Sequence, residues 1–136
     1  MTDAAPTSRE RPLSPHVQVW RWHVTMAASI LHRATGVVLY LGAVLFAGWA
    51  LALAAGPDAY DRFRLIVGSP LGKLALIGIT FSLFYHLANG VRHLVWDFGS
   101  GFQLKTADLT AAAVVAFAAL ATLGGWIVAG ATGGLA

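Results

Sequence analysis

Three long stretches of this 136-residue chain carry no charged side chain. They run from Ala34 to Pro57, from Leu74 to Val91 and from Leu109 to Ala136, and they contain 24, 18 and 28 residues. A helix needs about 20 residues to cross a hydrocarbon core of roughly 30 Å. In lipid only helices and closed barrels satisfy their backbone hydrogen bonds, and none of these stretches alternates as a barrel strand would. The sequence therefore predicts three transmembrane helices.

The composition excludes a free-standing soluble enzyme. Hydrophobic residues make up 57% of the chain and charged residues only 11%, against roughly 25% charged residues in a typical soluble domain. There is no cysteine, which excludes a thiolate nucleophile and iron–sulfur ligation by this chain. The net charge of +3 does not indicate nucleic acid as a partner, because the charges border the apolar stretches.

We expect an all-α membrane protein with a single membrane-anchor domain over residues 1–136. The spans are expected at residues 26–56, 71–96 and 108–134. Residues 1–25 are expected to form a cytoplasmic and interfacial segment with a short helix. That helix should begin at Ser14 and Pro15, a capping hydroxyl followed by proline. The two tryptophans after it fit either an interfacial anchor or a docking surface for a cytoplasmic partner.

Basic residues near the span ends predict the orientation. The N-terminal side and the second connection hold six of them, Arg9, Arg11, Arg21, Arg33, Arg92 and Lys105, and the first connection holds three, Arg62, Arg64 and Lys73. This difference predicts a cytoplasmic N-terminus and a periplasmic C-terminus. The first ten residues contain two acidic residues and one arginine, unlike an Arg-rich mitochondrial transit peptide. We therefore expect a multi-pass protein of a bacterial inner membrane.

His86 lies inside the second predicted span, about eight residues or roughly 12 Å from its end near Leu94. An ionisable side chain at this depth is costly and commonly marks a cofactor, an ion path or a partner. Gly90, one turn along the same face, leaves room for a flat ligand or a neighbouring helix. Imidazole is a common axial ligand of haem iron. Two interpretations stay open: a haem ligand, or a neutral histidine bonded to a facing hydroxyl or carbonyl.

A second polar cluster lies at the start of the first predicted span. Ser29, His32, Arg33 and Gly36 are spaced i, i+3, i+4 and i+7 and so share one helix face. Arg33 alone would fit a side chain that snorkels to the headgroups. A hydroxyl, an imidazole and a guanidinium together fit a quinone carbonyl or haem propionates. We expect His32 at the interfacial end and His86 a couple of turns deeper, so that a second haem ligand would come from another chain.

Two segments resemble the signatures of a known family. Residues 11–13 with Ser29 to Gly36, and then His86 to Gly99, are similar to the two signatures of the cytochrome b556 membrane-anchor subunits of succinate dehydrogenase (respiratory complex II). The resemblance covers residues 11–99, and the third span matches only by its hydropathy. It implies a three-helix anchor that forms half of a heterodimeric membrane helix bundle with a second small anchor subunit. It also implies an iron–sulfur subunit and a flavoprotein subunit on the cytoplasmic side.

The resemblance also implies a cofactor and its residues. His86 would be the axial ligand of a haem b, and therefore the metal-binding residue, with the haem between the two anchors. The other implied residues lie towards the cytoplasmic ends of the first two spans: His32, Arg33 and His93 at the haem propionates, Ser29 and Arg33 at the quinone, and Arg92 and Asp97 as interface support. No catalytic residue is implied in this chain, because FAD and the iron–sulfur clusters belong to other subunits.

The implied function is to help pass electrons from the iron–sulfur subunit to ubiquinone, in the respiratory chain and the tricarboxylic acid cycle. The chain would then be part of an oxidoreductase and inactive alone. One alternative is the equivalent anchor of a quinol:fumarate reductase. Another is a non-redox anchor or assembly protein whose histidines only bond neighbouring helices. No dinucleotide, phosphate-loop or hydrolase motif is present.

Overall fold

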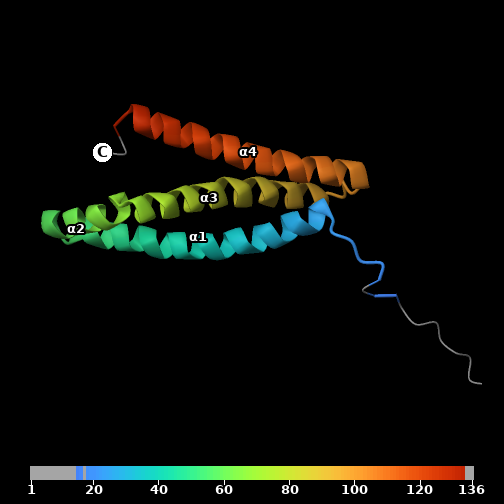
Figure 1. Ribbon diagram of the computed structural model, residues 1–136, viewed down its shortest axis with the longest axis horizontal. Helices are drawn as coiled ribbons and strands as arrows, with labels where there is room; N and C mark the ends of the chain where they lie inside the picture. The colour runs from blue at the N-terminus through green and yellow to red at the C-terminus, as the bar shows by residue number, and fades with distance from the viewer. Residues whose placement is uncertain (1–14, 17, 134–136) are drawn as a thin grey trace, which may run out of the picture.

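The structure, a computed structural model, describes residues 15, 16 and 18–133. Every regular element in these residues is a helix: α1 (Val24–Ala54), α2 (Pro57–Gly68), α3 (Pro70–Asp97) and α4 (Leu104–Ala131). By length and composition α1, α3 and α4 are able to cross a membrane, so the prediction of an all-α protein with three spans is confirmed. Figure 1 shows the three long helices side by side, with α3 in the middle.

The chain ahead of α1 differs from the prediction. Residues 15, 16 and 18–23 contain no helix, although the Val19 amide donates a hydrogen bond to the Pro15 carbonyl, 3.3 Å. Ser14, the predicted cap, lies outside the described residues. A helix this short does not offset its nucleation cost unless its side chains pack against another element. Trp20 and Trp22 are largely exposed here.

A helix that the sequence analysis missed fills the connection between α1 and α3. The chain turns at Gly56, whose φ is 103°, and Pro57 then occupies the first position of α2, where a missing amide hydrogen costs nothing. Phe63 and Val67 are half-buried, whereas the charged residues of α2 are exposed. The side chain of Ser69 caps the start of α3 by accepting a hydrogen bond from the Gly72 amide, 3.1 Å. The helix α2 therefore closes one end of the bundle, which we call the α2 end.

Small side chains form the contact between α3 and α4. The buried residues of α4 recur every three or four positions: Ala107, Ala111, Val114, Ala118 and Thr122. Such a stripe lets two helix backbones approach closely. Beyond Thr122 no described residue of α4 is buried, and Figure 1 shows α4 diverging from α3 towards its C-terminal end.

Tyr85 ties α3 to α1. Its side chain is fully buried, and its hydroxyl donates a hydrogen bond to the Ala28 carbonyl, 2.8 Å. Carbonyls within a helix already accept one bond, so this is a second bond on the same oxygen. A buried tyrosine that finds a partner for its hydroxyl combines a large apolar contact with a specific bond. This contact helps fix the register of α1 against α3 at the end of the bundle where α1 begins, which we call the histidine end.

Candidate functional site

Two imidazoles from different helices meet inside the bundle. The rings of His32 on α1 and His86 on α3 stack with their centroids 3.9 Å apart and their planes 10° from parallel. The expectation that His32 lies a couple of turns from His86 is therefore wrong. The reason is that α1 begins at Val24 and runs antiparallel to α3, which ends at Asp97. His32 then lies about 12 Å from its helix end and His86 about 16 Å from its own.

The inner nitrogen of His86 is held by α1. Its Nδ1 lies 3.2 Å from the His32 carbonyl oxygen and 3.3 Å from the Thr35 hydroxyl, which itself donates to the same carbonyl at 2.9 Å. A carbonyl only accepts hydrogen bonds, so Nδ1 must carry the proton. In the neutral ring Nε2 is then unprotonated, and it has no hydrogen-bond partner among the described residues. An unprotonated imidazole nitrogen without a partner is the form that ligates a metal.

Two glycines border this ring in different ways. A Cβ added to Gly36 would lie 3.3 Å from Cε1 of His86, so Gly36 makes the room in which the ring rests against α1. A Cβ added to Gly90 would meet nothing within 4 Å in the described chain. Gly90 therefore borders open space beside His86, as a flat ligand or a partner helix would require.

A third imidazole lies near the stacked pair. The ring of His93 is 5.4 Å from that of His32 and 5.0 Å from Trp96. Nδ1 of His32 is buried and has no hydrogen-bond partner among the residues described. Within those residues no group of three or more His, Cys, Asp or Glu side chains is arranged to hold a bare metal ion. This agrees with the stacking of His32 on His86, because stacked rings turn their faces and not their nitrogens towards each other. The cluster instead leaves one buried nitrogen for which the described residues supply no partner.

The residues predicted to bind quinone lie one turn apart on α1. Ser29 is half-buried and Arg33 is exposed. Neither side chain bonds to another residue in the described part of the chain. A hydroxyl and a guanidinium on one face are thus available to a ligand or to another subunit.

Arg92 and Asp97 do not join this cluster. The Arg92 side chain is turned towards α4, where it donates to the Thr110 hydroxyl at 3.0 Å and to the Ala107 carbonyl at 2.9 Å. Its guanidinium also stacks over Trp96, 4.0 Å from the ring centroid. Arg92 is only 7% exposed, so its hydrogen bonds stabilise the α3–α4 contact within this chain. Asp97 is exposed at the last position of α3.

Three apolar helices with imidazoles stacked between two of them define a multi-pass membrane protein with a polar site inside its bundle. The chain belongs to the family of succinate dehydrogenase/fumarate reductase transmembrane subunits, whose family model matches residues 7–125. The recognition made from the two signatures is thereby confirmed.

Curated relatives agree with this assignment. The succinate dehydrogenase cytochrome b556 subunit of Rickettsia felis is 36% identical over 118 residues, which cover 87% of this chain and 92% of the relative. The mitochondrial succinate dehydrogenase cytochrome b560 subunit of Mus musculus is 40% identical over 120 residues, covering 87% of this chain and 71% of the relative. The corresponding human subunit is 37% identical over 116 residues, which cover 84% of this chain and 69% of the relative. The chain is thus similar to subunits of an oxidoreductase from both bacteria and mitochondria.

Proposed function

We propose that this chain is the cytochrome b membrane anchor of a succinate:quinone oxidoreductase, which helps to hold haem b and ubiquinone and is inactive alone. The observation that carries the proposal is the state of His86. Its Nδ1 is held by the His32 carbonyl and the Thr35 hydroxyl, and its Nε2 is left without a partner in the described chain. The relatives named above are all succinate dehydrogenase subunits, which favours succinate oxidation over fumarate reduction.

The residues present fit one half of a haem site. His86 would supply one axial ligand through Nε2, and the open space beside Gly90 leaves room for a flat ring. Nδ1 of His32, which has no partner among the described residues, would bond a propionate, with His93, whose ring lies 5.4 Å from that of His32, and Arg33, the next residue on α1, as further donors. When bound, the haem supplies a one-electron carrier.

A second axial ligand is proposed to come from the partner anchor. His32 stacks face to face with His86, so the two rings lie side by side and His32 would not supply the second ligand. His93 belongs to the same helix as His86 and lies on the same side of the site. The haem would therefore be shared between two chains, and this chain would be half of a heterodimeric helix bundle.

The quinone would be bound by Ser29 and Arg33. Reduction of ubiquinone to ubiquinol takes two electrons and two protons, and negative charge builds on a quinone oxygen as the electrons arrive. The Ser29 hydroxyl would donate a hydrogen bond to one carbonyl oxygen, and the Arg33 guanidinium would stabilise the developing charge. The electrons would come from the iron–sulfur subunit, and FAD and the clusters would belong to the soluble subunits.

The proposed setting is a bacterial inner membrane with the histidine end on the cytoplasmic side. The excess of Lys and Arg on the N-terminal side and in the second connection supports this orientation. The histidine end would then face the iron–sulfur and flavoprotein subunits, and the α2 end would face the periplasm.

Purification in mild detergent tests this function. We expect a second small anchor, an iron–sulfur subunit and a flavoprotein to co-purify with the chain, and a dithionite-reduced minus oxidised spectrum to show a b-type haem band. Co-purification without that band would favour the non-redox anchor. Absence of the soluble subunits would contradict the proposal as a whole.

Thr35 offers a test of how His86 is held. Replacement of Thr35 by valine removes the hydroxyl beside Nδ1 while keeping the side-chain shape. Loss of a bond that orients a ligand typically costs about tenfold or more in affinity for the metal group, so we expect the purified complex to retain haem about tenfold less tightly. Thr35→Ser, which keeps the hydroxyl, is the matched control. Equal haem retention in the two variants would show that the hydroxyl does not orient His86.

A further inference from the structure

A cleft lies at the α2 end of the bundle, opposite the histidine site. Its volume is ≈ 480 Å³, and all four helices border it, with Trp49 from α1, Arg64 from α2, Lys73 from α3 and Trp126 from α4. It exists because α4 leaves α3 beyond Thr122, the last buried residue of that helix. The nitrogen of the Trp126 ring still reaches across the gap to the Thr80 hydroxyl, 3.4 Å.

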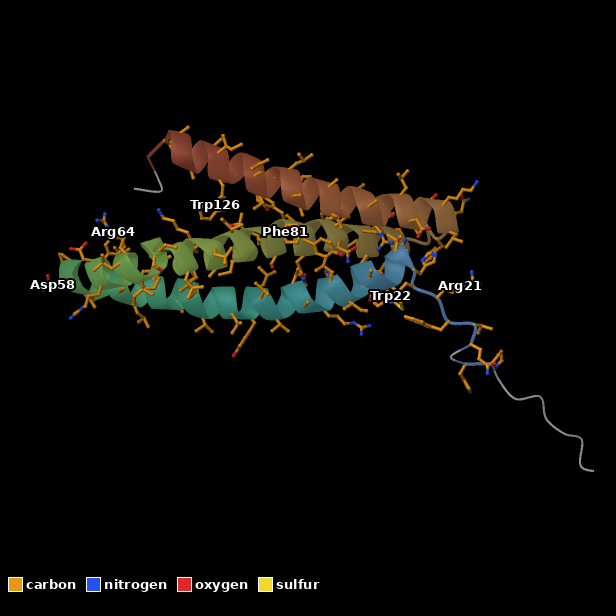
Figure 2. All side chains as sticks on the ribbon, viewed as in Figure 1. Arg21, Trp22, Asp58, Arg64, Phe81 and Trp126 are labelled. Carbon is orange, nitrogen blue, oxygen red and sulfur yellow. The ribbon has the colours of Figure 1, made fainter. Side chains whose placement is uncertain are left out.

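Two cations border the cleft. Arg64 is exposed and makes no hydrogen bond or ion pair with another residue in the described ranges. Figure 2 shows Arg64 extending from α2 on the side of α4, and Trp126 extending from α4 towards α3. Lys73 adds a second positive charge from the first turn of α3. The cleft is therefore a basic site flanked by tryptophans, which prefer the membrane–water interface.

Two apolar grooves continue from the cleft on either side of α3. One, ≈ 320 Å³, lies between α1, α2 and α3 and shares Trp49 and Phe63 with the cleft. The other, ≈ 460 Å³, lies between α3 and α4 and shares Trp126 with it. From the cleft the first groove reaches Gly42 on α1, and the second reaches Phe81 on α3. Nothing in the site at the histidine end uses them.

We propose that the cleft binds the phosphate headgroup of an anionic phospholipid, and that the two acyl chains lie in the two grooves. The guanidinium of Arg64 suits a phosphate because its donors match two phosphate oxygens, and Lys73 adds a point charge. A basic pocket between helices with apolar space below it is typical of lipid-headgroup recognition. The single headgroup site and the two grooves match the branched shape of a two-chain lipid. This site does not depend on haem or quinone binding.

Native mass spectrometry of the purified complex, with the subunits that co-purify, tests the proposal. The complex is exchanged into detergent containing either phosphatidylglycerol or phosphatidylcholine. We expect wild-type complex to retain phosphatidylglycerol, and the Arg64→Gln/Lys73→Gln double variant to retain at least about tenfold less, since both charged contacts are lost. Arg62→Gln is the matched control, because Arg62 is exposed on the same helix and does not line the cleft. It should retain phosphatidylglycerol as wild type does.

Three results would overturn the proposal. They are equal retention by wild type and the double variant, an equal loss in Arg62→Gln, and retention of phosphatidylcholine or quinone in place of phosphatidylglycerol. If the double variant does not assemble, Arg64→Gln alone carries the test, because an exposed side chain on α2 is replaced without disturbing the packing. A reduction of about threefold or more is then expected, and no reduction counts against the site.

Discussion

Replacement of His86 by leucine is expected to lower the haem content of the purified complex and to change its reduced-minus-oxidised spectrum. The change removes the Nε2 that we propose as axial ligand. The His32 ring lies stacked on His86 and has a buried nitrogen without a partner among the described residues, so it is positioned to replace the lost ligand in part. The double variant His86→Leu/His32→Leu removes both rings, and we expect its haem content to fall at least about tenfold.

His23→Leu is the control for these variants. It removes an imidazole at the start of α1 that contacts Thr25 and Asp108 and lies outside the histidine cluster. Its haem content should equal that of wild type. An unchanged spectrum in both His86→Leu and the double variant would place the ligand elsewhere.

Replacement of Arg33 by leucine should separate two activities of the complex. Reduction of ubiquinone by succinate should fall about a hundredfold, the typical cost of losing one preorganised group that stabilises a developing negative charge. Succinate oxidation with a soluble dye as acceptor should stay at the wild-type rate, because it needs only the soluble subunits and their clusters. Both rates are measured on the same purified complex.

Two further variants sharpen this test. Arg21→Leu removes an exposed arginine from the chain ahead of α1 and should leave both rates unchanged. Arg33→Lys keeps the charge and loses the two-pronged hydrogen bonding of the guanidinium, so its ubiquinone rate should lie between those of wild type and Arg33→Leu. An equal fall of both activities in Arg33→Leu would mean that the residue supports assembly and not quinone binding.

The spans were predictable from the sequence because a charged side chain in the hydrocarbon core is costly. The charged segments between the uncharged stretches marked the limits of the three spans. The helix α4 begins at Leu104, ahead of the predicted span start at residue 108, because the helix extends beyond the apolar stretch to include Lys105 and Asp108. The helix α2 was missed because its residues were read only for their charge. The half-buried Phe63 and Val67 are four residues apart among charged neighbours, which follows helical spacing and was the available signal.

The candidate site was predictable in its residue types and less so in its geometry. The sequence pointed to His32 and His86, and their contact depended on the start of α1 and on the register between two helices. The local sequence pattern determines neither the start of α1 nor the register between the two helices. Thr35 was missed for the same reason, although a hydroxyl three residues after His32 in an apolar span was a usable signal. Arg92 was expected to give interface support, and the structure shows that its direction depends on α4, which packs against that side of α3.

A density map of the assembled complex that shows side chains tests the central claim most directly. We predict that Nε2 of His86 is bonded to a haem iron, that its Nδ1 remains at the His32 carbonyl, and that the opposite ligand comes from another polypeptide. A map in which this imidazole points into lipid, or bonds only to neighbouring protein groups with no porphyrin beside it, would contradict the account.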